Sequence, residues 1–147
     1  MKCPFCRSSN TDVYNTRSTK FGNQIWRRRR CLECRKTFTT YEAPDLRFLT
    51  VTDGQQSKSF NRAKLYASVY QAFLEVPDKD DVIDAVTDTI ETKLLDLKQE
   101  TITLTEIRSN VLSTLKHFNS AAFVRYLSAQ SPPNASPAEL ARLMKKY

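Results

Sequence analysis

Four cysteines constrain this chain more than any other feature. They form two Cys-x-x-Cys pairs, Cys3 with Cys6 and Cys31 with Cys34, separated by 24 residues, and no cysteine follows them. Each pair makes a tight turn that presents two sulfurs, and two such turns complete a tetrahedron of thiolates. Four protein ligands leave no open coordination position, so we expect one structural Zn²⁺ ion rather than a catalytic metal.

The expected compartment bears on the choice between a metal site and disulfides. The chain begins Met-Lys-Cys-Pro-Phe-Cys, without the apolar core of a signal peptide, and nowhere do about 18 apolar residues run uninterrupted. We therefore expect a cytoplasmic protein without a membrane segment, where paired cysteines are more often metal ligands than disulfides. A thioredoxin-like redox pair is another alternative, but two pairs without a βαβ pattern fit it poorly.

The positive charge is confined to the same segment as the cysteines. Residues 1–44 hold ten lysines and arginines against three acidic residues, so the whole net charge of +7 lies there. Arginine forks suit phosphate oxygens and guanine edges, which predicts a nucleic-acid surface; the alternative is a solvated charged surface. If the run of four arginines before Cys31 is a strand, successive side chains alternate between its faces. The candidate residues are Arg17, Arg27, Arg28, Arg29, Arg30, Arg35 and Lys36.

The order of β-prone and turn-forming residues divides the chain. Short β-prone stretches at 13–14, 25–26 and 37–41, with turn-formers at 8–10 and 22–23, predict an antiparallel sheet too small to fold without metal. Ala43-Pro44-Asp45 is the expected linker, because proline disfavours helix in the residue before it. We expect a metal-binding module over 1–44, a second domain over 45–131 and a tail over 132–147.

The second domain is predicted to be mostly helical. Two β-prone runs around Asp53-Gly54 predict a hairpin. Apolar residues at helical spacing predict helices from Asn61 to about residue 75, over about 79–98, from a Thr103/Glu106 capping box, and from Asn119 to about 129. A proline-rich break at 132–134 then precedes a short tail helix. The fold class is therefore α+β, a small antiparallel zinc module followed by a helical domain with a β-hairpin.

Few residues of the second domain suggest a role in ligand binding, metal binding or catalysis. Lys64 lies at the expected start of a helix, where backbone N–H groups favour an anionic ligand, although a solvated lysine is the simpler explanation. His117 has no partner at metal-ligand spacing and is expected at a helix end. We see no nucleophile with a base and no phosphate-binding glycine loop in a chain of two glycines, so we do not expect an enzyme.

Three motifs together closely resemble the zinc ribbon of the NrdR family, bacterial transcriptional repressors of ribonucleotide reductase genes. They are Cys3-Pro-Phe-Cys6, Arg27-Arg-Arg-Arg-Cys-Leu-Glu-Cys34 and Phe38-Thr-Thr-Tyr-Glu42. Beyond them, Asp53-Gly54, Phe60-Asn-Arg-Ala-Lys-Leu65 and Ala122-Phe-Val-Arg-Tyr126 resemble landmarks of that family's ATP-cone. The resemblance covers nearly the whole chain.

The resemblance implies a zinc-dependent repressor whose ribbon binds double-stranded DNA. It also implies a cone that binds ATP or dATP, with Lys64 and Arg62 as nucleotide contacts, and a homo-oligomer whose state follows the bound nucleotide. Such control requires each nucleotide to differ in affinity between the assembly states.

Several positions mark the chain as a divergent member. Val51-Thr52 stands where the family usually has a Lys-Arg pair, and Arg108 stands where it usually has a glycine. Near the fourth expected helix, the family usually has a segment that contains tyrosine. This chain has Phe123 there, followed by Ala129-Gln130-Ser131. Two alternatives follow: a diverged or phage-type transcription factor whose cone binds no nucleotide, and a structural zinc-ribbon protein bound to RNA or a polymerase. A preference for duplex DNA would separate the repressor from the RNA-binding alternative.

Overall fold

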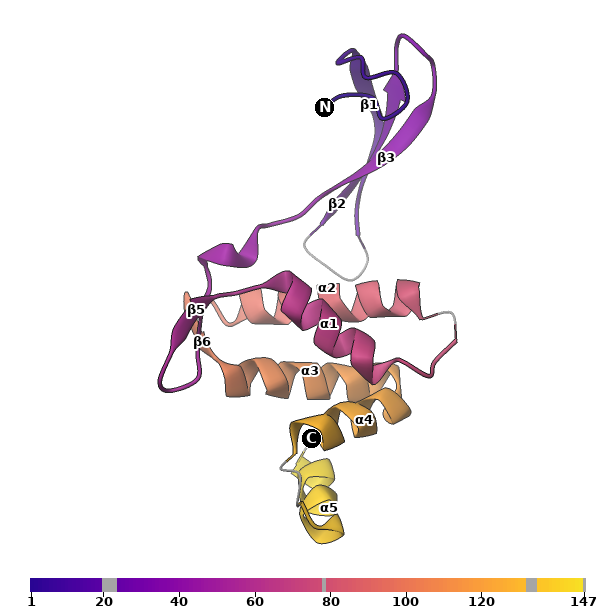
Figure 1. Cartoon of the computed structure of the whole chain (residues 1–147). Coiled ribbons are helices and arrows are strands. Elements are labelled where there is room, and N and C mark those ends of the chain that lie inside the picture. Colours follow the sequence, from indigo (N-terminus) through magenta and orange to yellow (C-terminus); the bar gives the residue numbers. More distant parts are fainter. Residues whose placement is uncertain (20–23, 78, 132–134, 147) are drawn as a thin grey trace. The chain divides into compact units, whose positions relative to one another are not determined.

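The structure is a computed structural model that describes residues 1–19, 24–77, 79–131 and 135–146 (Figure 1). It contains two compact units, Met1–Asp45 and Leu46–Tyr147. The basic residue Lys20, the turn expected at 22–23 and the break at 132–134 lie outside the described residues.

The first unit is a three-stranded antiparallel sheet. Strands β1 (Thr11–Ser18), β2 (Ile25–Cys31) and β3 (Thr37–Glu42) follow the order β1-β2-β3 and contain the predicted β-prone stretches. The pairing of β1 with β2 shifts between Val13 and Asn15, which leaves Tyr14 as an extra residue in a bulge. Among the described residues of this unit only Cys3 and Cys31 are buried, so the sheet has no apolar core of its own.

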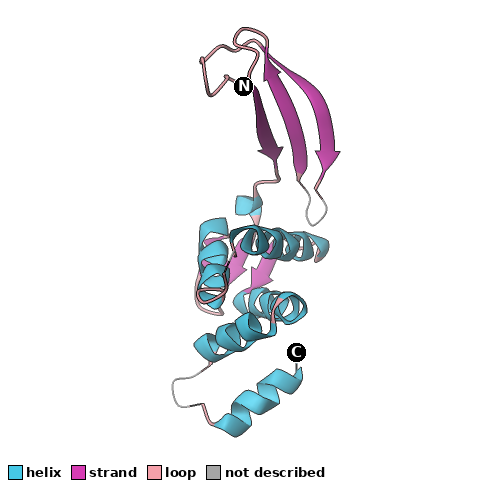
Figure 2. Cartoon of the chain, turned by 90° about the vertical axis from the view of Figure 1, so that its right-hand side faces the viewer, coloured by secondary structure: helices cyan, strands magenta, loops and turns pink. Residues whose placement is uncertain are grey.

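The second unit contains a small mixed sheet with helices beside it (Figure 2). After a 3₁₀ turn, Leu46–Phe48, strands β4 (Thr50–Thr52) and β5 (Ser57–Ser59) form the predicted antiparallel hairpin. Gly54 adopts a φ of +92° in the turn, which favours glycine. A third strand, β6 (Thr101–Thr103), pairs in parallel with β4. Strand β6 was not expected from the sequence, because a run of three residues is too short to show an alternating pattern.

The helices begin where the capping residues predict. Helix α1 (Arg62–Ala72) starts after Asn61, and α4 (Ser120–Gln130) starts after Asn119, whose side chain accepts from the Ala122 N–H at 2.9 Å. Helix α2 spans Asp80–Asp96, and α3 (Leu104–Phe118) opens on the predicted capping box. Helix α1 ends about three residues before the predicted end, because tighter turns replace the helical bonds from Phe73 onward.

One apolar core holds the second unit together. Helix α1 packs against α2 and α4, and α3 packs against the same two helices. Most of the apolar residues at helical spacing are buried in this core. In α2, Val82 and Leu97 also have that spacing but are only half-buried, and Ile83 is buried beside Val82. Helix α5 (Pro137–Lys146) follows, and its Leu143 packs against this core. The predicted fold class is confirmed: an antiparallel sheet with a four-cysteine cluster, then a mostly helical unit with a β-hairpin.

Candidate metal centre, nucleic-acid surface and ligand cavity

The four cysteine sulfurs converge at one end of the first unit. All four lie within 4.8 Å of one another, with 3.7 Å between the sulfurs of Cys3 and Cys34 and 3.5 Å between those of Cys6 and Cys31. Zn–S bonds of about 2.3 Å in a tetrahedron place sulfurs about 3.8 Å apart. The geometry and the soft thiolate donors therefore fit one tetrahedral zinc ion.

The two Cys-x-x-Cys turns share one backbone pattern. The N–H of Arg7 donates to the carbonyl of Cys3 at 2.9 Å, and the N–H of Arg35 donates to the carbonyl of Cys31 at 3.0 Å. Both arginines have positive φ, +65° and +60°, a conformation that costs a side-chain-bearing residue about 1 kcal/mol or more. Glycine usually marks a left-handed position in a sequence, so arginine at these two positions carries no such signal.

The pKa values of two of these thiols differ widely. Burial raises the pKa of the Cys3 thiol, but the backbone N–H groups of Cys6 and Phe5 and the neighbouring thiols bring it down to about 7. Although the Ser8 backbone lowers the pKa of Cys6, burial and the hydrogen bonds to the other sulfurs raise it to about 12. Negative charge on neighbouring thiolates is repulsive, and a bound divalent cation would offset that repulsion.

The seven predicted nucleic-acid contacts all lie in this unit, but in different segments and on both faces of strand β2. Strand β2 carries Arg27 and Arg29 on one face and Arg28 and Arg30 on the other, as strand alternation predicts. Arg17 lies on β1, opposite Trp26. Arg35 and Lys36 follow Cys34, and the Lys36 ammonium lies 4.8 Å from the Phe5 ring centre. The arginine run therefore forms no single cluster.

The second unit contains a cavity of about 330 Å³. Three exposed cations line it from separate elements: Lys58 of β5, Lys64 of α1 and Arg108 of α3. Asp53 also lines it, and backbone N–H groups of Gln56 and Gln55 donate to its carboxylate, which lowers its pKa. The cavity therefore carries a net positive charge.

Apolar and aromatic groups form the rest of the cavity wall. Val51, Leu65 and Ile107 contribute aliphatic surface, and Tyr126 contributes an almost fully buried ring. Burial raises the pKa of the Tyr126 phenol, although Arg108 and a hydrogen bond with Ser68 lower it. A cavity with cations on three sides and an aromatic wall can accept an anionic ligand that carries a ring.

Arg62 lies at a different place from Lys64. It is not among the residues that line the cavity, and its guanidinium donates to Asp88 at 3.0 Å and to Glu91 at 3.2 Å. Burial raises the pKa of the Glu91 carboxyl in spite of this arginine. The structure therefore assigns Arg62 a packing contact between α1 and α2, and a nucleotide contact stays a prediction. Lys58 and Arg108 were not predicted as site residues, because no motif marks either position.

These features define the class of the protein. A basic sheet with a four-cysteine cluster that fits one zinc ion, followed by a helical domain with a cationic cavity, defines a zinc-ribbon protein with a separate candidate ligand-binding domain. Residues 1–42 match the family model described as "Transcriptional repressor NrdR-like, N-terminal domain", and residues 53–130 match the ATP cone domain. The chain belongs to the NrdR family of transcriptional repressors.

Curated relatives support this assignment. The chain is 42% identical to the transcriptional repressor NrdR of Acidovorax sp. (strain JS42) over 130 residues, 87% of each chain. It is 39% identical to the NrdR of Nitrosomonas europaea, covering 87% of this chain and 81% of the relative. It is 34% identical to the NrdR of Finegoldia magna, covering 87% and 86%. The predicted resemblance is confirmed. Among the described residues, no helix has the length and apolar character needed to cross a membrane.

Proposed function

We propose that this chain represses ribonucleotide reductase genes by binding double-stranded DNA through its zinc ribbon, under the control of ATP or dATP bound to its cone. The observation that carries this proposal is that the features suited to DNA and those suited to a nucleotide lie in different units. The four-cysteine cluster and the net charge of +7 lie in the first, and the cationic cavity lies in the second.

Charge supports the ribbon as the DNA-binding unit. The seven basic residues are exposed or half-exposed, so they can reach phosphate oxygens without refolding the sheet. Four thiolates with one Zn²⁺ add a local charge of about −2, which leaves the ribbon strongly basic. The seven basic residues predicted from the sequence are the candidates from which the DNA contacts are drawn: Arg17, Arg27, Arg28, Arg29, Arg30, Arg35 and Lys36.

Salt should weaken DNA binding steeply. If all seven residues neutralise phosphates, the logarithm of the association constant falls against the logarithm of salt concentration with a slope of about −6 per bound ribbon. Fluorescence anisotropy with a labelled operator-length duplex between 50 and 200 mM salt measures that slope. Unlabelled double-stranded RNA serves as the competing control. A flat salt response, or equal competition by RNA, would contradict binding to duplex DNA through the ribbon.

The cavity supports nucleotide binding by the cone. Its volume falls in the usual range for small-molecule sites, about 300–1,000 Å³. Lys64 lies in the first turn of α1, where the helix dipole and N–H groups add to the attraction for phosphate. Lys58 and Arg108 face the same space and are proposed phosphate contacts as well. The aliphatic and aromatic wall is suited to the base and sugar.

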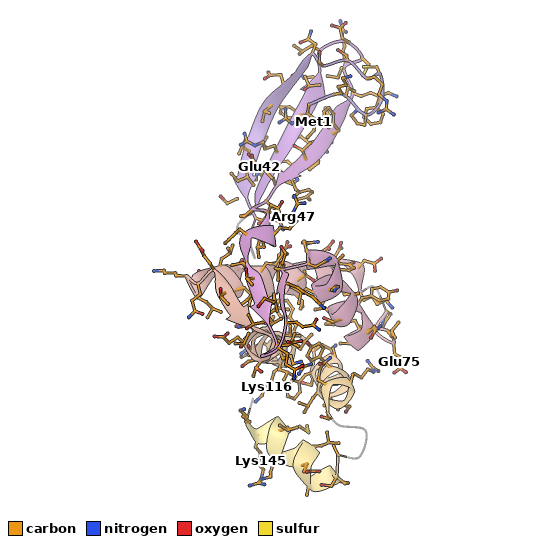
Figure 3. All side chains as sticks on the ribbon, turned by 60° about the vertical axis from the view of Figure 1, so that its left-hand side comes forward. Met1, Glu42, Arg47, Glu75, Lys116 and Lys145 are labelled. Atoms are coloured by element: carbon orange, nitrogen blue, oxygen red, sulfur yellow. The ribbon has the colours of Figure 1, made fainter. Side chains whose placement is uncertain are left out.

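Replacing Lys64 by alanine should weaken ATP and dATP binding about tenfold or more. A charge-assisted hydrogen bond contributes about 1.5–3 kcal/mol, and each 1.4 kcal/mol is a factor of ten. Calorimetric titration of the zinc-loaded protein measures the dissociation constants. The control is Lys116→Ala, because Lys116 is an exposed lysine in the last turn of α3 and lies outside the cavity lining (Figure 3).

The same titration tests the cone as a sensor. Light scattering beside the calorimetry reports whether bound nucleotide changes the oligomeric state, which regulation through assembly requires. A wild-type protein that binds neither nucleotide would support the alternative, a DNA-binding zinc protein whose cone serves assembly only. Equal affinity of wild type and the Lys64 variant would show that Lys64 makes no phosphate contact.

A further inference from the structure

The register of the ribbon sheet sorts its arginines into two sets. In β2, Trp26, Arg28 and Arg30 share one face, and Ile25, Arg27 and Arg29 share the other. Residues paired across antiparallel strands lie on the same face, so Arg17 and Tyr41, the two partners of Trp26, join the first set. Tyr14, at the bulge, joins it by contact with Arg30. We call this the arginine-aromatic face: Tyr14, Arg17, Trp26, Arg28, Arg30 and Tyr41.

Each guanidinium on the arginine-aromatic face is held by a neutral group. Arg17 lies over the Trp26 ring with 5.9 Å to its centre, and Arg30 lies over the Tyr14 ring at 5.8 Å. Arg28 donates to the hydroxyls of Thr39 at 2.8 Å and Thr37 at 3.0 Å. A guanidinium has five N–H donors, so each arginine keeps donors for another partner.

No carboxylate neutralises these three arginines within the described part of the chain. Asp12 is the register partner of Arg30, yet no ion pair joins the two, because the Arg30 guanidinium lies over Tyr14. The three cations are therefore oriented before any ligand arrives, which lowers the entropy lost on binding. Tyr14 and Tyr41, 52% and 64% exposed, add aromatic surface beside them.

The opposite face differs in charge and in contacts. Arg27 forms an ion pair with Glu42, with 2.7 Å between Nη2 and Oε2, and Glu42 lies at the end of β3 (Figure 3). Arg29 donates to the Thr40 hydroxyl at 3.2 Å, and its register partners Val13 and Phe38 are half-buried apolar residues. This face therefore offers less unneutralised charge and fewer oriented donors.

We infer that DNA phosphates bind the arginine-aromatic face, through Arg17, Arg28 and Arg30, and that Arg27 and Arg29 contribute only to the sheet. This inference rests on the proposed function that the ribbon binds DNA, and it narrows the seven predicted contacts. The ligand chemistry is the sugar-phosphate backbone of a duplex, which planar guanidinium groups bind in a bidentate manner.

Two double variants test the inference with matched charge. Arg28→Gln with Arg30→Gln removes two charges from the arginine-aromatic face, and Arg27→Gln with Arg29→Gln removes two charges from the other face of the same strand. We expect the first variant to bind duplex DNA at least about thirtyfold more weakly, with a salt slope shallower by about 2. The second should change affinity less than about threefold and leave the slope unchanged.

Each outcome separates the inference from the proposed function. Equal losses in both double variants would overturn the inference and leave DNA binding by the ribbon intact. A wild-type protein without DNA affinity would overturn both. Because Arg27 pairs with Glu42, zinc content and circular dichroism must show that both variants are folded. If the second variant fails that test, the single variants Arg30→Gln and Arg29→Gln give the same comparison without breaking the ion pair.

Discussion

Replacing Cys31 by serine should abolish zinc binding by the ribbon and, with it, DNA binding, while the second unit stays folded. Three thiolates hold the metal poorly, and the described part of the first unit buries only Cys3 and Cys31, so no apolar core compensates. The zinc-binding free energy of such sites, roughly 10–16 kcal/mol, is largely their folding free energy. Zinc content, NMR dispersion of the ribbon amides and duplex affinity measure the effect.

Leu32→Ser is the matched control for this variant. Leu32 lies next to Cys31 in the same turn and is 54% exposed, so the change introduces the same residue without removing a metal ligand. It should keep zinc and DNA affinity. Chelation of the wild-type protein should reproduce the Cys31 defect, and added zinc should reverse it. A Cys31→Ser protein that retained both metal and DNA would refute the four-cysteine site.

Local signals explain what the sequence predicted well. Each Cys-x-x-Cys turn is a short-range structure that brings its own two sulfurs together. The helix starts at Asn61, Thr103 and Asn119 are set by side chains that bond within three residues. The apolar stripes of the helices are likewise a local pattern with a helical period, and nearly all of their members are buried in the second unit.

Nonlocal geometry explains what the sequence could not predict. Strand β6 exists because β4 offers it a partner about fifty residues earlier in the chain. The cavity cations Lys58 and Arg108 come from elements far apart in sequence, and Arg62 is drawn to two carboxylates of α2. Tyr14 lies at the bulge of β1, and its ring contacts the guanidinium group of Arg30. None of these contacts follows from a periodic pattern in the sequence.

The two units are stabilised by different means, and this separates their functions. The ribbon depends on a metal, and the second unit depends on an apolar core drawn from α1, α2, α3 and α4. A perturbation of the core should therefore leave the metal site occupied. Phe73 provides the strongest test, because it is among the largest side chains with no exposed surface and it directly follows α1.

Phe73→Ala should destabilise the second unit by about 3–5 kcal/mol, the usual cost of truncating a fully buried phenylalanine. That is a large part of the 5–15 kcal/mol that ordinarily holds a domain together. Urea denaturation followed by far-ultraviolet circular dichroism measures the loss. Because Lys64 lies on α1, nucleotide affinity should fall as α1 loses its packing, while the zinc content stays at that of the wild type.

The neighbouring residue gives the control for this last comparison. Leu74 is 56% exposed, so Leu74→Ala should cost less than about 1 kcal/mol and leave nucleotide affinity unchanged. If Phe73→Ala released zinc as well, the ribbon would depend on the second unit for its fold, and the separation into a metal-stabilised and a core-stabilised unit would be wrong. If zinc stayed bound and only the urea midpoint and nucleotide affinity fell, each unit would have its own source of stability.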